Sequence, residues 1–188
     1  MYECVIDFPS VSCNVDARHG RGNLKHENGD VYQGRFVDDL KSGKGIFNVG
    51  GDIYHCEFVE DFMEGQGRLK FANGDVYEGS FSAGEQTGVG LLRFSRNNIY
   101  EGEFLNGLMH GKGKLRLADG NCYEGDYIDG AMHGKGKFVY ADGNTYVGDW
   151  SEGMMNGKGL FTYSDGNVFE GDFVEGMFGF DCLFDTIV

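Results

Sequence analysis

The chain has 188 residues, with 33 glycines, a single proline, 14% aromatic residues and a formal net charge of −14. This aromatic content excludes a disordered chain, and the glycines follow no Gly-X-Y triplet, which excludes collagen. The negative charge excludes a nucleic-acid-binding surface, disfavours anionic lipid surfaces and favours basic protein partners.

Five cysteines, Cys4, Cys13, Cys56, Cys122 and Cys182, show neither CxxC pairs nor a cysteine–histidine ligand spacing. An odd number without such spacing indicates free thiols in a reducing compartment. No apolar stretch is as long as a membrane span, which needs about 18 residues. The first residues also lack the basic region of a secretory signal. We therefore expect a cytoplasmic protein.

In chain order, residues 1–18 are predicted to form an N-terminal cap. Tyr2, Cys4 and Ile6 resemble half of the repeat that follows, and an insertion with Pro9 comes after them. Residues 19–177 are then predicted to form seven repeats, each about 23 residues long. Residues 178–188 are expected to form a C-terminal cap strand, because repeat arrays need caps to cover their terminal faces.

Each repeat contains an aromatic residue, a glycine two residues later (cysteine in the second repeat) and a second aromatic after two more. The first aromatic recurs at a step of 23 residues, with one step of 22. A period in this range indicates a stack of small identical units rather than one globule. The seven copies are Tyr32-Gly34-Phe36, Tyr54-Cys56-Phe58, Tyr77-Gly79-Phe81, Tyr100-Gly102-Phe104, Tyr123-Gly125-Tyr127, Tyr146-Gly148-Trp150 and Phe169-Gly171-Phe173.

The residue pattern within one repeat predicts two β-strands. Residues 121–128 alternate between an aromatic face and a charged face, which is the period of a β-strand. Residues 129–133 break this alternation with turn residues, residues 134–140 resume it, and Asp142-Gly143 is typical of a tight turn between antiparallel strands. The chain is therefore expected to be all-β, an elongated single-layer array of antiparallel hairpins forming a twisted ribbon of about 65–70 Å.

Two turns recur in register. The short turn carries Asn-Gly, Gly-Gly or Asp-Gly, which tolerate positive φ, in every repeat but the fourth, where Arg96-Asn97 stands. The longer turn carries glycine in the later repeats but Asp39 and Asp61 in the first two. Because aspartate also visits the left-handed region, we expect the same turn there.

Glycine lies between the two aromatics of most first strands, and glycine pairs such as Gly134 and Gly136 recur on second strands. A side chain at these positions would push the rings apart. We expect rings of one hairpin to lie over the glycine backbone of its neighbours, with ring edges against ring faces. Because a lone hairpin is marginal in water, stability must come from stacking.

This pattern resembles the MORN repeat (membrane occupation and recognition nexus), in which Tyr-x-Gly-x-Phe/Trp precedes Gly-x-x-His-Gly-x-Gly. The match is clearest at Tyr123, Gly125, Gly130, His133 and Gly136, and the resemblance covers residues 19–177. It departs in the second repeat, where cysteine replaces glycine. The resemblance implies cytoskeletal or membrane-associated assemblies, often with helical partners or self-association.

No group of residues indicates catalysis, a metal site or a cofactor. His110 and His133 lie one repeat apart, about 10 Å, which is too far to share a metal ion. The carboxylates of the charged face repeat without a cleft, which argues against paired acid–base catalysis. Glycine-x-glycine recurs without completing a phosphate-binding motif. We therefore expect a non-enzymatic protein without catalytic, metal-binding or cofactor-binding residues.

The aromatic face is the first candidate binding surface, although its rings could equally be core. No sequence remains to build a second sheet over the concave side, so some rings should line an open groove. An amphipathic helix would complete the missing layer, and the net charge favours a basic helix. The predicted groove residues are Tyr77, Phe81, Tyr100, Phe104, Tyr123, Tyr127, Tyr146 and Trp150.

The longer turns of the second half form a second candidate surface, because methionine is common on adaptable binding surfaces. The alternative is that neighbouring loops pack on one another. The residues of this possible apolar edge are Met109, Met132, Met155 and Phe178.

Charged side chains form stripes on the face opposite the rings, where cross-strand pairs contribute some tenths of a kcal/mol each. Lys112, Lys114, Lys135 and Lys137 could form a strip for phosphoinositide headgroups, a lipid-binding alternative that the net charge disfavours. A regulatory array from a larger enzyme is a third alternative. Self-association as a homodimer through an array end also stays open.

Overall fold

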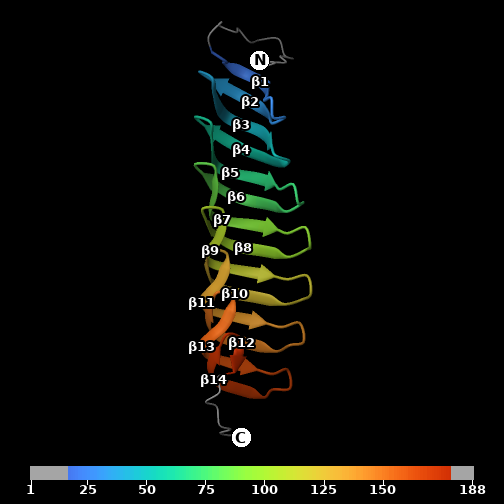
Figure 1. Ribbon diagram of the computed structural model, residues 1–188, viewed down its shortest axis with the longest axis vertical. Coiled ribbons are helices and arrows are strands. Elements are labelled where there is room, and N and C mark those ends of the chain that lie inside the picture. The colour runs from blue at the N-terminus through green and yellow to red at the C-terminus, as the bar shows by residue number, and fades with distance from the viewer. Residues whose placement is uncertain (1–16, 179–188) are drawn as a thin grey trace. The chain divides into compact units, whose positions relative to one another are not determined.

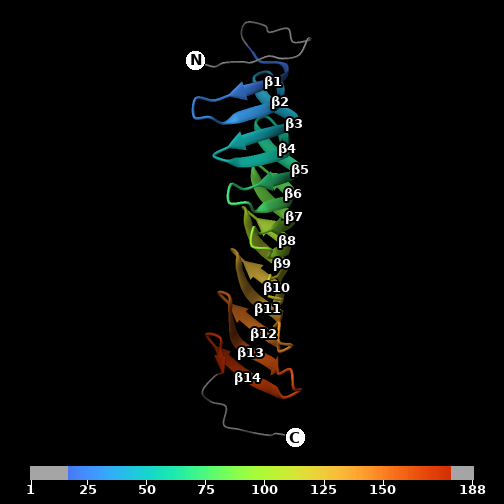
Figure 2. The same ribbon diagram turned by 90° about the vertical axis from the view of Figure 1, so that its right-hand side faces the viewer.

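In the computed structural model, residues 17–178 are described, and the chain forms two compact units, Met1–Ser95 (unit 1) and Arg96–Val188 (unit 2). Within each unit, consecutive strands pair antiparallel in chain order (Figures 1 and 2). Residues 17–178 contain no helix, and hence no helix that could cross a membrane. The predicted all-β array of single-layer hairpins is confirmed. Of the predicted caps, residues 1–16 and 179–188 lie outside the described part.

From β2 (Val31–Val37) to β13 (Met154–Thr162), each hairpin contains a strand that carries the two aromatics of a repeat and a strand that carries its Gly-x-Gly pair. The strands of unit 1 are β1 (Gly20–Lys25), β2 (Val31–Val37), β3 (Leu40–Val49), β4 (Asp52–Val59), β5 (Phe62–Lys70), β6 (Val76–Ser82) and β7 (Glu85–Arg93). Those of unit 2 are β8 (Ile99–Leu105), β9 (Leu108–Arg116), β10 (Cys122–Ile128), β11 (Ala131–Val139), β12 (Thr145–Ser151), β13 (Met154–Thr162), β14 (Val168–Val174) and β15 (Met177–Phe178).

The two turns have the reverse of the expected lengths. Asp129 and Gly130 alone join β10 to β11, and both have positive φ, 48° and 87°. This is the two-residue turn whose twist matches that of its strands. The turn with Asp142-Gly143 is longer and joins β11 to β12. In it, the Gly143 N–H donates to the Tyr140 carbonyl at 3.0 Å, and the Tyr140 N–H donates to the Asn144 carbonyl at 2.9 Å. Asp-Gly fits both turns, so composition alone did not distinguish them.

The residues that replace glycine in these turns adopt the same backbone conformation. Asp39 and Asp61 have φ of 69° and 74°, which confirms that the first two repeats keep the turn. Asn97 has φ of 66°, so the expectation that the fourth repeat departs from the pattern is wrong. Asparagine and aspartate tolerate the left-handed region because their short polar side chains bond locally.

The first aromatic ring covers two glycines of its own hairpin. A Cβ added to Gly136 would lie 2.5 Å from ring carbons of Tyr123, and one added to Gly125 would lie 2.5 Å from its hydroxyl. These two glycines are direct cross-strand partners, so the ring lies over its own hairpin. The expectation that it lies over the glycines of a neighbouring hairpin is therefore wrong. We call this space the ring seat. Five tyrosines occupy it and donate to the carbonyl three residues on: Tyr32, Tyr77, Tyr100, Tyr123 and Tyr146.

Rings of successive hairpins meet edge to face, as predicted. Tyr123 contacts Trp150 of the next hairpin with centroids 5.0 Å apart and planes at 80°. In unit 1, Tyr32 and Phe58 meet at 5.1 Å and 79°. Such pairs contribute about 0.5–1.5 kcal/mol beyond their burial. They therefore connect successive hairpins within each unit.

The two glycines of a Gly-x-Gly pair have different roles. Gly134 has φ of 57° and lies opposite the register shift between Gly125 and Asp126, so it forms a β-bulge in the left-handed conformation. Gly136 is the glycine beneath the ring. The expectation that both glycines clear space for rings is therefore correct only for the second.

Hydrogen bonds also join successive hairpins at both turns. The Gly153 N–H donates to the Met132 carbonyl at 2.9 Å, and the Ala141 N–H donates to Asn121 Oδ1 at 2.8 Å. Unit 1 repeats both bonds, from the Asp61 N–H to the Lys41 carbonyl and from the Ala72 N–H to Asp52 Oδ1. Within each unit, these bonds restrain successive hairpins against one another.

Candidate functional site

The aromatic face is the core of each unit and does not line an open groove. The eight rings predicted there are between 0% and 6% exposed. They are buried because each first ring fills a glycine seat, and second rings such as Tyr127 and Trp150 pack against a tyrosine ring of the preceding hairpin. The expectation of an exposed aromatic groove is therefore corrected for Tyr77, Phe81, Tyr100, Phe104, Tyr123, Tyr127, Tyr146 and Trp150.

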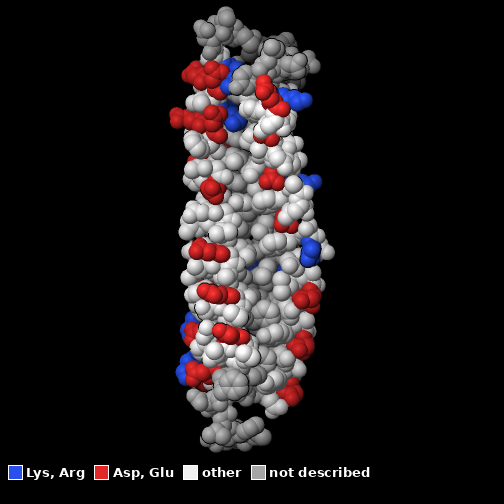
Figure 3. Space-filling view, viewed as in Figure 1, with Lys and Arg blue, Asp and Glu red and all other residues white. Residues whose placement is uncertain are grey.

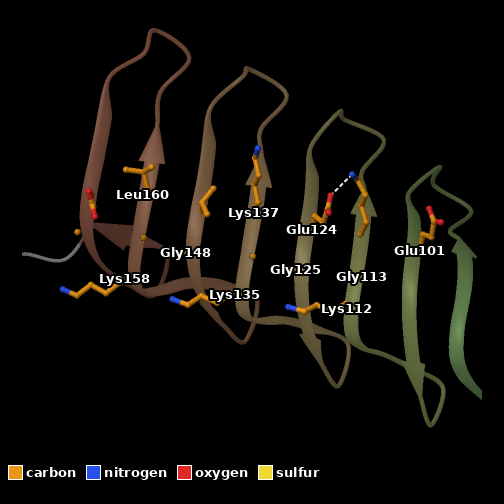
Figure 4. A pocket seen from close by; sticks show the side chains of 16 residues that line it. Glu101, Lys112, Gly113, Glu124, Gly125, Lys135, Lys137, Gly148, Lys158 and Leu160 are labelled. Carbon is orange, nitrogen blue, oxygen red and sulfur yellow. Dashed lines mark hydrogen bonds and ion pairs between the residues drawn. The ribbon is translucent and has the colours of Figure 1, made fainter.

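An open groove of about 1380 Å³ instead lies on the opposite, charged face of unit 2 (Figure 4). Glycines of the ring seats, including Gly125, Gly136 and Gly148, form part of its lining. Five lysines and three glutamates also line it, together with Val147 and Leu160. On the face of the molecule drawn in Figure 3, by contrast, carboxylates outnumber lysines and arginines. The groove thus differs from the acidic average of the chain.

At the bulges, each carboxylate stabilises two neighbouring strands. Asp149 pairs with Lys135 of the preceding strand at 2.5 Å and accepts a hydrogen bond from the Lys158 N–H at 3.1 Å. Asp126 makes the same contacts with Lys112 and with the Lys135 N–H. These lysine ammonium groups hold the pKa of Asp126 and of Asp149 below the usual range. In this bulge row, the charges of the groove lysines Lys112 and Lys135 are therefore neutralised by the aspartates beside the groove.

A second row of side chains runs parallel to the bulge row, toward the Asp-Gly turns. Glu124 pairs with Lys114 at 2.7 Å, which lowers the pKa of the glutamate and raises that of the lysine. Glu101 lies 3.8 Å from Arg116. Both ion pairs are largely exposed, so each contributes little to stability.

This second row is interrupted by two apolar side chains. Val147 on β12 and Leu160 on β13 are cross-strand partners, and they are 47% and 38% exposed. Lys137 on β11 is the partner of Val147, and Glu170 on β14 is the partner of Leu160. We call these four residues the Lys137–Glu170 row. Sequence reasoning missed it, although its parity relative to the tyrosines could have located it.

The predicted lysine strip lies in this groove, but most of its charge is matched. Lys112, Lys114 and Lys135 pair with Asp126, Glu124 and Asp149 respectively. Among residues 17–178, Lys137 has no carboxylate within ion-pair distance. One unmatched lysine offers much less attraction for an anionic headgroup than four would.

The methionines predicted for an apolar edge are half-buried on the ring face. Met109, Met132 and Met155 are the cross-strand partners of Phe104, Tyr127 and Trp150. For Phe178, only the backbone in β15 is described. The exposed apolar residues near these turns include Leu108, Met154 and Met177, with exposed fractions of 47%, 42% and 58%.

Within residues 17–178, no group of His, Cys, Asp or Glu side chains is arranged to hold a metal ion. Cys56 is buried, and burial raises the pKa of its thiol to about 11, which makes it a weak nucleophile at neutral pH. Cys122 is half-buried on the charged face.

Comparison with protein families gives a match to the MORN repeat at six places: residues 32–48, 54–76, 77–99, 100–122, 123–145 and 146–168. Each matched segment begins at the tyrosine of a predicted repeat. A comparison with curated proteins found no significant match.

Several solved structures show a distant likeness. The TCP domain of Drosophila melanogaster SAS-4 (dCPAP), in complex with a proline-rich motif of Ana2, has 15% identity and a TM-score of 0.48, covering 88% of this chain and 96% of that one. The CPAP G-box domain has 14% identity and a TM-score of 0.46, with coverage of 93% and 100%. The TCP10 domain of Danio rerio CPAP has 16% identity and a TM-score of 0.38, with coverage of 81% and 84%.

Proposed function

Because this chain belongs to the MORN-repeat family, we propose that it is a non-catalytic protein-interaction module that binds a helical partner segment in the groove of unit 2. The observation that carries this proposal is the groove on the charged face, with exposed Val147 and Leu160 in an otherwise charged row. Apolar contact with a few placed charges is the usual composition of a binding site.

The groove has the dimensions of a helix-binding site. Its lining comes from every strand between β8 and β14, so it crosses six strand spacings, or about 29 Å at 4.8 Å each. A helix of about 19 residues has this length. An amphipathic helix would place its apolar stripe on Val147 and Leu160 and its polar flanks against the ion pairs of the groove.

The residues of the groove support binding rather than catalysis. Glu124 in its lining and the bulge carboxylates Asp126 and Asp149 beside it are paired with lysines and have lowered pKa values, which is the reverse of what a general acid needs at neutral pH. Phosphoinositide binding is less favoured, because three of the four candidate lysines already have carboxylate partners. Flotation of the chain with phosphoinositide vesicles would distinguish lipid from protein partners.

A display selection tests the proposed function. A library of helical peptides is selected on the immobilised full chain, and the affinities of the enriched peptides are measured by calorimetry. Leu160→Lys places a charge in the apolar gap of the groove and should weaken groove-binding peptides by at least about tenfold. The matched control is Met154→Lys on the same strand, because Met154 is similarly exposed (42% against 38%) but does not line the groove.

The control variant should bind the peptides as the original chain does. Enriched peptides that are weakened equally by both substitutions, or by neither, would contradict groove binding. Thermal melts followed by Trp150 fluorescence check that both variants remain folded.

A further inference from the structure

We infer that the partner helix of the groove carries an acidic, an apolar and a basic residue in that order along one face, matched to the Lys137–Glu170 row. This inference rests on the proposed function and specifies the chemistry of the partner. The row places a cation, two apolar side chains and a carboxylate on four consecutive strands of unit 2.

Register places the four side chains on one line across the sheet. Lys137 is directly opposite Val147, Val147 is opposite Leu160, and Leu160 is opposite Glu170. Figure 4 shows Lys137 and Leu160 on the same side of their strands, above the bulge lysines Lys135 and Lys158. A segment that lies along the groove therefore meets these four side chains one after another.

The two charges at the ends of the row are available to a partner. Glu124, the other cross-strand neighbour of Lys137, already pairs with Lys114 at 2.7 Å. Within the described part of the chain, neither Lys137 nor Glu170 has an oppositely charged group within ion-pair distance. The other lysines of the groove are engaged, so a partner gains new ion pairs mainly at these two ends.

The exposed apolar pair between the charges sets the middle of the motif. Val147 and Leu160 stand where the row has a carboxylate or a lysine on β8 to β11. An aliphatic or aromatic side chain placed on them buries apolar surface, which contributes about 25 cal/mol per Å². A charged side chain there would lose its water without gaining a partner.

The spacing of the row fits a helix. Lys137 and Glu170 are three strand spacings apart, about 14 Å. Residues i, i+4 and i+8 of a helix lie near one face and span about 12 Å, and long charged side chains bridge the remainder. A helix with glutamate, leucine and lysine at these positions therefore matches the row, in the direction that places its glutamate at Lys137.

Three designed peptides test this inference on the full chain. They share one alanine-rich helical sequence and differ only at i, i+4 and i+8, which read Glu–Leu–Lys, Lys–Leu–Lys or Glu–Leu–Glu. The original chain should bind Glu–Leu–Lys best. Lys137→Glu should transfer the preference to Lys–Leu–Lys, and Glu170→Lys should transfer it to Glu–Leu–Glu, each by about tenfold in affinity because like charges repel across an interface.

The outcomes separate this inference from the proposed function. Equal binding of all three peptides that is lost in Leu160→Lys would overturn the charge order and leave groove binding intact. Failure of the three peptides, with other groove-dependent peptides enriched by display, would have the same meaning. Absence of any groove-dependent peptide would overturn both. Preferences that switch as stated, and weaken as salt is raised, would establish the inference.

Discussion

Hairpin β6–β7 of unit 1 and hairpin β10–β11 of unit 2 make the same contacts on the ring face and different contacts on the opposite face. On the ring face, Tyr77 donates to the Ser80 carbonyl at 2.9 Å, and Tyr123 donates to the Asp126 carbonyl at 3.0 Å. On the opposite face, the Ser80 hydroxyl accepts a hydrogen bond from Gln66, whereas Asp126 forms an ion pair with Lys112. The ring face thus builds the fold, and the opposite face is free to differ between repeats.

Hairpin β4–β5 of unit 1 shows how far the ring face itself can vary. Cys56 replaces the glycine of the first strand, and its sulfur lies 2.6 Å from where a Cβ on Gly67 would be. The thiol therefore fills the space that a tyrosine ring fills in other hairpins, and Tyr54 is left half-buried. The seat must be filled, but the filling group need not be a ring.

Alkaline pH should unfold unit 2 before unit 1, and this is the largest expected effect. Burial raises the pKa of Tyr77 and of Tyr146 to about 12. A raised pKa means that the fold favours the neutral phenol, so stability is complete below the ordinary pKa of about 10 and is lost as pH rises through the folded pKa. The shift of Tyr77 alone corresponds to about 3 kcal/mol. Among residues 17–178, five tyrosines of unit 2 have a raised pKa, against three of unit 1.

Two probes separate the units in this titration. Trp150 is the single tryptophan and reports on unit 2 by fluorescence, and the buried Cys56 reports on unit 1 by pulsed alkylation and mass spectrometry. Alkylation of Cys56 at a lower pH than the change in Trp150 fluorescence would contradict the expected order.

Gly136→Ala should destabilise unit 2 by about 3 kcal/mol or more, because the added methyl overlaps the Tyr123 ring. Gly22→Ala is the matched control at the same position of a repeat in unit 1. The nearest described atom to its Cβ is a Phe36 ring carbon at 3.9 Å, so the change should be neutral or slightly stabilising. Chemical denaturation measures both, and a tolerated Gly136→Ala would disprove the ring seat.

A pair of tyrosine substitutions compares two hydroxyls within one strand. The Tyr127 hydroxyl is buried without a hydrogen-bond partner, so Tyr127→Phe should raise stability by about 1 kcal/mol. Tyr123→Phe removes a hydrogen bond to the Asp126 carbonyl and should lower stability by about the same amount. Equal signs for the two changes in denaturation midpoint would contradict this assignment.

Acid should weaken unit 2 slightly, which is the smallest of the expected effects. Lysine partners lower the pKa of Asp126 and Asp149, so their stabilisation is present above the ordinary pKa of about 3.9 and is lost as pH falls through the folded values. Melts followed by Trp150 fluorescence from about pH 5 to about pH 2 should show this loss. The double variant Asp126→Asn/Asp149→Asn should show a smaller fall in melting temperature per pH unit. An unchanged fall would mean that other groups cause the loss of stability.

The sequence was sufficient for the hairpins and for the ring contacts. Alternation around Tyr123 and Gly125 has the period of a strand. Because the same pattern recurs in every repeat and a lone hairpin is marginal in water, the hairpins are expected to stack. Asp39 and Asp61 could also be placed, because few residues accept positive φ.

Three features could not be obtained from the pattern. Asp-Gly suits both turns, so the lengths around Gly130 and Gly143 needed the hydrogen bonds. The burial of Tyr123 depends on Trp150 of the next hairpin as well as on its own glycine seat, and a single repeat does not show that contact. The unmatched charge in the groove depends on which of Lys112, Lys114 and Lys137 have carboxylate partners. Those partners come from several strands, so one repeat does not show them.

Nuclear magnetic resonance mapping of a display-selected peptide on the full chain tests the central claim most directly. The claim is that the ring face builds the fold and the opposite face of unit 2 binds the partner. It predicts contacts between the peptide and the methyl groups of Val147 and Leu160, shifts at the Gly148 and Gly159 amides, and unchanged Tyr123 and Trp150 ring signals. Peptide contacts with those two rings, without changes at Val147 and Leu160, would contradict it.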